Sequence, residues 1–194
     1  KVKPRRSLVF IAFTAEEYGL LGSKHYVQHP TWDLAKTAAV LNLDGIGTEI
    51  MGPVKSMVAY GAPLTSLGPL FSEVARAYGI HPMDDPIPEQ GVFARSDHFS
   101  FAERGVPGLM LVGSPVDVPA QFKERFEAFE STKYHQPSDD VYRDWYWKGA
   151  RKVADMMALV GHRVAQADAM PTFNAGTEYA ALVRGQAPKA EEKK

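Results

Sequence analysis

Four short apolar segments, separated by polar and glycine-rich stretches, set the pattern of hydrophobic positions along the chain. Three of them are residues 8–13 (LVFIAF), 38–43 (AAVLNL) and 109–112 (LMLV), and residues 57–60 form a weaker fourth. Near-continuous apolar runs with β-branched and aromatic members are typical of strands buried on both faces of a parallel or mixed sheet. We therefore predict a buried strand at each of the four segments.

Between these segments, hydrophobic residues recur every three or four positions. The spacing is clear over residues 67–78 and again over residues 153–164, and it predicts helices that turn one apolar stripe toward a core. Strands that alternate with such helices indicate the α/β class. We predict a three-layer α/β/α sandwich around a mixed, mostly parallel sheet.

The pattern also predicts where the folded unit ends. Helical periodicity is lost after Ala167, and the chain finishes in QAPKAEEKK, which is too polar to order itself by burial. We expect one domain over residues 1–168 and a tail over residues 169–194 with a disordered end. The Pro-rich residues 81–89 predict a surface loop. Because a core strand is predicted as early as Leu8, we expect the N-terminal part of the domain to lie upstream of Lys1.

Charge balance, cysteine content and the length of the apolar runs exclude several classes of function. The 194 residues include 22 Lys and Arg against 23 Asp and Glu, a balance that argues against nucleic acid or an anionic membrane as partner. No cysteine is present, so a thiol nucleophile is excluded and any metal must be bound by His, Asp or Glu. No apolar run approaches the length of a membrane span.

Carboxylates follow the first two predicted strands directly. Glu16 and Glu17 come after residues 8–13, and Asp44 comes after residues 38–43. Ligands of open α/β sheets bind beyond the carboxyl ends of the strands, where one glutamate can bind a metal while its neighbour takes a proton from metal-bound water. Two alternatives stay open at this point. The glutamate pair also suits the start of a helix, and Asp44 before Gly45 is ordinary turn chemistry.

The six histidines are not equally promising as ligands. His25 and His29 have the i, i+4 spacing of a metal pair on a helix, but they lack an HExxH context and are expected to be solvent-exposed. His98 in RSDH and His135 in YHQPSD lie among polar residues on irregular segments. These two are the better candidates.

Four segments taken together, in this order, resemble a known family. They are FIAFTAEEYGLLGSKHYV, AAVLNLDGIG, FARSDHFSFAERGVPGLML and KYHQPSDD. They resemble the co-catalytic di-zinc aminopeptidases of metallopeptidase family 28, a zinc exopeptidase-like fold. The Glu-Glu-GLLGS block and the YHxPSD block are the most specific. The match runs from about Arg6 to Asp140, so the chain resembles the C-terminal part of the catalytic domain.

The resemblance implies roles for individual residues. Glu16 would be the general base, and Glu17 and His135 would bind one of two zinc ions. Asp44 would bind the other zinc. Tyr134 would donate a hydrogen bond to the tetrahedral oxyanion, although a core-packing role for its ring stays open.

The resemblance also implies a substrate and a place of action. The substrates would be peptides with a free N-terminus. Arg95 and Asp97 would approach that N-terminus, and Met110 and Leu111 would floor the pocket for the first side chain. A secreted or periplasmic enzyme is expected.

One departure from the family pattern bears on activity. Family members contribute a further His ligand and a bridging Asp before the Glu-Glu block, yet none of the fifteen residues before Glu16 is His or Asp. We expect this chain alone to have an incomplete metal site and little activity. Two alternatives are a glutaminyl-cyclase-like enzyme with one zinc and a non-catalytic interaction domain of the same fold.

Overall fold

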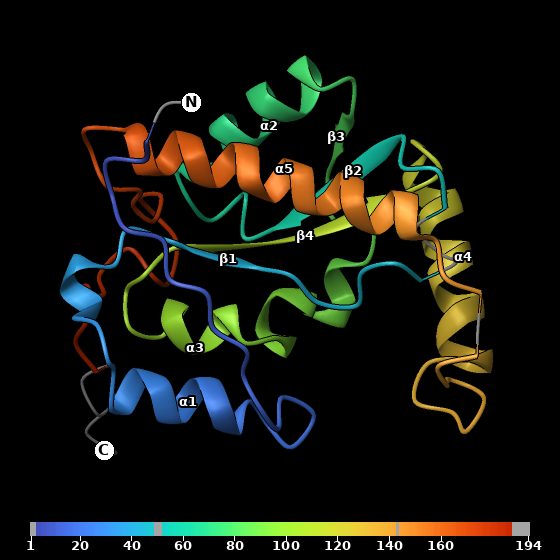
Figure 1. Ribbon diagram of the computed structural model, residues 1–194, viewed down its shortest axis with the longest axis horizontal. Helices are drawn as coiled ribbons and strands as arrows, with labels where there is room; N and C mark the ends of the chain where they lie inside the picture. Colours follow the sequence, from blue (N-terminus) through green and yellow to red (C-terminus); the bar gives the residue numbers. More distant parts are fainter. Residues whose placement is uncertain (1–2, 49–51, 143, 188–194) are drawn as a thin grey trace.

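A four-stranded mixed sheet forms the middle of the molecule (Figure 1). The computed structural model describes residues 3–48, 52–142 and 144–187. In spatial order the strands are β1 (Val40–Asn42), β4 (Gly108–Ser114), β2 (Ser56–Tyr60) and β3 (His81–Met83). β1 pairs with β4 in parallel, β2 pairs with β3 in parallel, and β2 runs antiparallel to β4. The predicted mixed, mostly parallel sheet is confirmed.

Helices cover both faces of this sheet. The longer helices are α1 (Leu21–Gln28), α2 (Leu67–Ala77), α4 (Pro119–Thr132) and α5 (Trp147–Gln166). The short elements are α3 (His98–Ala102) and the 3-10 turns η1 (Leu34–Lys36), η3 (Pro88–Gln90) and η4 (Val92–Arg95). In Figure 1, α2 and α5 lie above the sheet and α1 and α3 below it, while α4 stands beyond the end of β4. The α/β/α layering agrees with the prediction.

Side-chain alternation along the strands divides the core into two parts. Leu109 and Leu111 of β4 are fully buried on the face that carries α2 and α5, together with Met156 of α5. Met110, between them in sequence, packs on the opposite face against Phe122 of α4. Full burial of each such side chain contributes about 1.5–3 kcal/mol. Burial on both faces explains why β4 is apolar at consecutive positions.

The strand predicted at residues 8–13 is not formed, and that prediction is wrong. No strand in the described part of the chain pairs with this segment, and residues 8–12 are exposed, with Phe10 at 92% of its full accessibility. Only Phe13 is partly buried, where its ring packs on those of Tyr26 and Phe101. An apolar run favours burial, but it becomes a strand only where a neighbouring strand supplies backbone hydrogen bonds. β1, which lies at the edge of the sheet, pairs only with β4 among the described strands.

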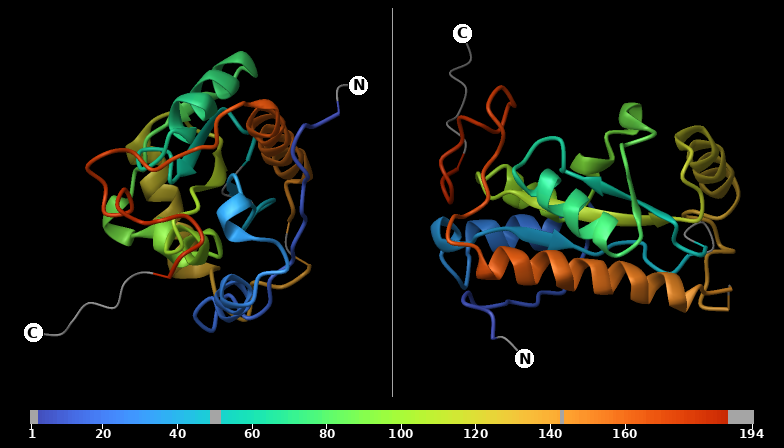
Figure 2. Two further views of the ribbon diagram at one scale, coloured as in Figure 1. Left: turned by 90° about the vertical axis from the view of Figure 1, so that its left-hand side faces the viewer. Right: turned by 90° about the horizontal axis from the view of Figure 1, so that it is seen from above.

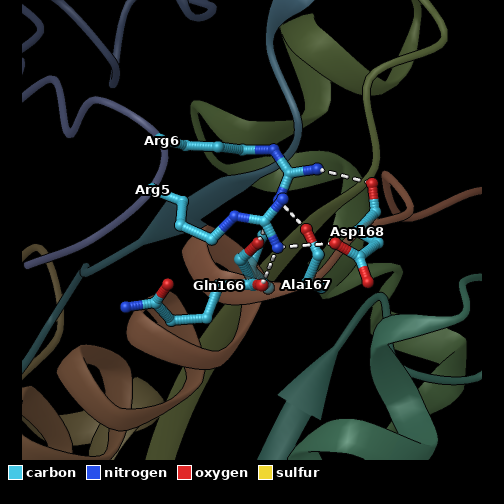
Figure 3. A network of polar contacts seen from close by, with 6 residues as sticks. Arg5, Arg6, Gln166, Ala167 and Asp168 are labelled. Carbon is cyan, nitrogen blue, oxygen red and sulfur yellow. Dashed lines mark hydrogen bonds and ion pairs between the residues drawn. The ribbon is translucent and has the colours of Figure 1, made fainter. Parts of the chain in front are cut away.

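Two arginines attach the start of this segment to the end of α5 (Figure 3). Arg6 Nη1 donates to the carbonyl oxygens of Val164 and Ala167 at 2.7 and 2.5 Å. Arg5 Nη1 donates to the Asp168 carboxylate at 2.5 Å. The last carbonyls of a helix have no partner within the helix, so these guanidinium groups cap α5 and fix the N-terminal segment beside it.

The C-terminal tail packs against the body at the end of the molecule opposite α4 (Figure 2). Phe173 forms a β-bridge with Thr65, and its ring stacks on the buried Tyr179 at 5.0 Å. Arg184 donates to the carbonyl oxygens of Thr37 and Ala38 at 2.6 and 3.0 Å. These contacts hold the first part of the tail, which precedes the polar stretch QAPKAEEKK. The polar residues 188–194 lie outside the described residues.

The Pro-rich stretch at residues 81–89 is a loop only in part. Its first three residues form the edge strand β3, which pairs with β2. Pro82 is compatible with this place because an edge strand leaves one row of backbone groups unpaired. No helix in the described parts of the chain is long and apolar enough to cross a membrane.

Candidate active site

The Glu-Glu pair lies in a tight turn that precedes α1. The turn is closed by backbone hydrogen bonds from Leu20 and Gly19 to the Glu16 carbonyl at 2.8 and 3.0 Å. Ala15, directly before the pair, has a φ of +55°, in the left-handed region that non-glycine residues seldom adopt. α1 begins at Leu21 with no acidic residue in its first turn. The two glutamates are therefore not the first turn of this helix.

Gly22 of the GLLGS block holds the turn against the helix. Its N–H donates to the Thr14 carbonyl at 3.0 Å, and a Cβ added at this position would lie 2.5 Å from that oxygen. No side chain fits so close to a backbone atom without a shift of the chain. The glycine therefore lets the helix approach the turn that carries Glu16 and Glu17.

Gly22→Ala is expected to destabilise the fold by about 1–3 kcal/mol, the usual cost of overpacking a close contact. The matched control is Gly161→Ala in α5, where the nearest atom to the new Cβ is a Leu41 methyl at 3.1 Å that can move. Urea unfolding of both variants measures the difference. Equal stability of the two variants would show that the Thr14 contact is unimportant.

Glu17 and His135 meet across 118 positions of sequence. Glu17 Oε1 lies 2.8 Å from His135 Nε2, with the two side chains 61% and 52% exposed. His135 has a φ of +56°, and its ring stacks on that of Tyr134 at 3.7 Å. A non-glycine residue in the left-handed region costs about 1–3 kcal/mol and persists only where the surroundings hold it. The backbone strain at His135 thus accompanies an imidazole aimed at a carboxylate.

Asp44 stands beyond the end of β1 and is held by a residue far away in sequence. Ser96 Oγ donates to Asp44 Oδ2 at 2.6 Å. Gly45 follows with a φ of +60°, so a turn is present as well. A contact with a serine 52 positions away is not explained by turn chemistry alone.

Glu16 lies within electrostatic reach of every other carboxylate of the site. Its pKa is raised to about 7, first by burial and then by Asp44, Glu17 and Asp97, while His135 opposes the shift. A carboxylate that exchanges its proton near neutral pH is suited to general acid-base catalysis.

The raised pKa of Glu16 predicts a pH dependence of stability in the metal-free protein. A carboxyl group that holds its proton more tightly when folded favours folding below its unfolded pKa near 4.5, and this advantage is lost as the pH rises through about 7. The protein should therefore lose stability over this range. Glu16→Gln should reduce that loss, whereas Glu124→Gln, at an exposed position of α4, should not. Denaturant unfolding at pH 4.5, 6 and 8 decides the matter, and identical profiles for all three proteins would contradict the prediction.

Tyr134 takes part in the same cluster. Burial raises the pKa of its phenol, as do Glu17, Asp44 and Glu16, and only Arg95 lowers it. The phenol consequently keeps its proton at neutral pH and can donate a hydrogen bond. Its half-buried ring also packs on Phe129 at 6.0 Å, so a packing role accompanies the polar one.

Arg95 and Asp97 lie on either side of Ser96 and differ in their surroundings. Arg95 Nη1 is 3.4 Å from Gln90 Oε1 and, together with Glu16 and Glu17, lines an open pocket of about 310 Å³. Asp97 Oδ1 is buried without a hydrogen-bond partner. Burial raises the pKa of Asp97, an effect that Ser23 partly offsets and Asp44 reinforces. An unpartnered buried carboxylate oxygen is suited to a cationic group.

Met110 and Leu111 do not share one surface. Leu111 is fully buried in the core below α2 and α5, and Met110 is buried on the other face of the sheet. Leu111 does not line the open pocket beside Glu16, and its place in a substrate pocket stays a prediction. Met110 lies on the face that carries η4 and α4, but it does not line the open pocket beside Glu16.

The other three histidine candidates differ in their solvent exposure. His25 and His29 are exposed on and just after α1, with their rings stacked at 4.7 Å. His98 is fully buried at the start of α3, and burial lowers its pKa to about 4, so its ring is neutral. Within the described residues, no group of three or more His, Asp and Glu side chains has the arrangement of a metal site. Glu17 and His135 are the pair already in contact.

Sequence reasoning missed Ser96 and Asn42. Asn42 Nδ2 donates to Ser96 Oγ at 2.7 Å, and Ser96 Oγ in turn donates to Asp44 Oδ2. Asn42 is thus connected to Asp44 through Ser96. The available signal was weak. Asn42 is a polar residue inside a predicted buried strand, where an unsatisfied amide is costly and a partner is therefore required.

Comparisons with known proteins add a family and a fold. The model of Peptidase family M28 matches residues 1–161. Leucine aminopeptidase 2 of Trichophyton rubrum is 33% identical over 152 residues, which cover 72% of this chain and 30% of that protein. The structure of an aminopeptidase from Aneurinibacillus sp. strain AM-1 aligns with a TM-score of 0.54 at 24% identity, over 78% of this chain and 32% of the other. The chain thus spans about a third of the length of these relatives.

Proposed function

The chain belongs to peptidase family M28, and from that membership we propose that it carries the general base and metal ligands of a zinc-dependent aminopeptidase. The reaction is hydrolysis of the N-terminal peptide bond of a peptide. The observation that carries the proposal is the contact of Glu17 with His135 beside a glutamate whose pKa is raised to about 7. The matched relatives are named as aminopeptidases, which supports the reaction class.

The donor set fits zinc. Carboxylate oxygen and imidazole nitrogen are both ordinary zinc ligands, and Glu17 and His135 would hold one ion while Asp44 would hold a second. Asp44, Glu17 and Asp97 all raise the pKa of Glu16, a repulsion that bound cations would offset. When bound, zinc polarises the scissile carbonyl and makes the attacking water more acidic.

The residues of the chain divide the remaining chemistry. Glu16 accepts the proton of the attacking water and returns it to the leaving amine, a role that requires a carboxylate of near-neutral pKa. Tyr134 donates a hydrogen bond to the oxygen of the scissile carbonyl, where negative charge develops. The partly buried Asp97 would lie near the α-ammonium group of the substrate.

Exopeptidase specificity follows from the same charges. A free α-ammonium group placed among Asp97, Asp44 and Glu16 gains attraction from several carboxylates, whereas an acylated nitrogen gains none. Arg95, on the rim of the open pocket, would orient the substrate near its N-terminus. Peptides with a blocked N-terminus should therefore not be hydrolysed.

The proposal is tested with the complete protein that contains this chain. Leucine p-nitroanilide should be hydrolysed, its N-acetyl derivative should not, and a chelator should abolish the activity until zinc is restored. Glutamine anilide serves as a second substrate. Formation of pyroglutamate in place of hydrolysis would identify a cyclase, and absence of both reactions in the zinc-loaded protein would identify a non-catalytic relative.

A further inference from the structure

A chain of polar side chains runs from the core of the molecule to Asp44. Asn42 Nδ2 lies 3.5 Å from His98 Nδ1 and 2.7 Å from Ser96 Oγ, and Ser96 Oγ lies 2.6 Å from Asp44 Oδ2. The four residues come from β1, the loop after it, the residues between η4 and α3, and the start of α3. Residues 42–44 and residues 96–98, two segments far apart in the sequence, thus meet at the Asp44 carboxylate.

The donor and the acceptor of each hydrogen bond from Asn42 to Asp44 can be assigned. The Asn42 amide nitrogen is only a donor, so Ser96 Oγ must accept from it. The Ser96 hydroxyl has a single proton, and the ionised Asp44 carboxylate only accepts, so that proton points to Asp44 Oδ2. Without Asn42 the hydroxyl would be free to rotate away from Asp44.

His98 is the buried end of this series of hydrogen-bonded side chains. Its side chain has no solvent exposure, its ring lies 5.0 Å from that of Phe93, and its Cβ lies 3.3 Å from the position of a Cβ added at Gly108. Nδ1 lies 3.5 Å from the Asn42 amide nitrogen, which can only donate, so Nδ1 is the acceptor of this contact and the ring proton is on Nε2. Among the described residues, Nε2 is buried without a hydrogen-bond partner. The tightly packed imidazole therefore fixes which way the amide faces.

We propose that Asn42 and His98 are positioning residues for Asp44, acting through the Ser96 hydroxyl. The inference rests on the proposed function, in which Asp44 binds zinc. Asp44 itself is exposed and precedes a glycine turn, so its own surroundings do little to hold its carboxylate. Mutation of a residue that hydrogen-bonds to a metal ligand typically lowers metal affinity by about 10- to 100-fold. We expect a loss of this size when Asn42 or Ser96 is replaced.

Nuclear magnetic resonance of the metal-free chain tests the positioning directly. Scalar couplings of Asp44 should report one χ1 rotamer in the wild type and averaged rotamers in Asn42→Leu and Ser96→Ala. The His98 ¹⁵N signals should show a protonated Nε2 and a bare Nδ1. The matched control is Asn174→Leu, which removes an amide that donates to the Pro63 carbonyl. An Asp44 rotamer that stays fixed in the folded Asn42→Leu and Ser96→Ala variants, or a protonated Nδ1 on His98, would overturn the proposal.

Zinc competition with a chelating dye separates this proposal from the one it rests on. In the complete protein, Asn42→Leu and Ser96→Ala should weaken zinc binding about 10- to 100-fold, and Ser96→Thr, which keeps the hydroxyl, should restore most of the affinity. Asp44→Asn is measured beside them. If Asp44→Asn weakens binding but Asn42→Leu and Ser96→Ala do not, the positioning role is wrong. If Asp44→Asn also has no effect, the zinc-binding role of Asp44 has failed.

Discussion

Glu16→Gln in the complete enzyme is expected to retain zinc and to lose turnover by about 10²- to 10⁴-fold, the usual contribution of a general base. The amide has nearly the shape of the carboxylate but cannot accept a proton from water. It also removes one negative charge from a cluster in which Asp44, Glu17 and Asp97 raise the pKa of Glu16. Because Glu16 is not one of the proposed zinc ligands, zinc content should remain close to that of the wild type.

Steady-state hydrolysis of leucine p-nitroanilide measures this effect, with zinc content determined on the same samples. Glu124→Gln makes the same chemical change at an exposed position of α4 and should leave kcat unaltered. The expected loss is in kcat at an unchanged zinc content. Near-normal turnover of Glu16→Gln would remove Glu16 from the role of base.

His135→Ala should have the second-largest effect, on metal binding itself. The imidazole nitrogen Nε2 of His135 lies 2.8 Å from the Glu17 carboxylate of the candidate site. Its loss should weaken zinc binding by more than the roughly 10- to 100-fold typical of residues behind a ligand. The left-handed backbone at His135 gives the variant no compensating relief, because alanine also carries a Cβ.

Zinc competition assays on the complete protein measure this change, and His81→Ala, at an exposed position of β3, is the control. Circular dichroism should show that both variants are folded. Equal zinc affinity of His135→Ala and His81→Ala would exclude His135 as a ligand.

The sequence predicts well those strands that pair with other strands of the described chain. β4 and β2 are apolar because they are buried on both faces, and the pattern identifies both. α4 was not predicted, because Phe122, Phe126 and Phe129 are its main apolar residues among many charged ones. Residues 8–13 show the limit of the method, since hydrophobicity reports a preference for burial but does not supply a pairing partner.

The candidate site was found in sequence because four motifs, taken together, resemble a known family, and because Glu16, Glu17 and Asp44 follow apolar segments. The convergence of Glu17 with His135 depends on a loop that follows α4, and local pattern alone does not give that contact. Asn42, Ser96 and His98 were harder still, because a hydrogen-bond chain between residues more than fifty positions apart leaves no periodic signal. Ser96 was within a quoted motif, but nothing local distinguished its hydroxyl from that of any other serine.

The central claim is that His135 and Glu17 form a zinc-binding pair, and the most direct test is a zinc titration followed by the ¹⁵N signals of the six histidines. We expect the Nε2 signal of His135 to change first, and Glu17→Gln to weaken this response. The stacked, exposed pair His25 and His29 offers the competing i, i+4 site. A response confined to His25 and His29, with His135 unchanged in wild type and in Glu17→Gln, would contradict the account.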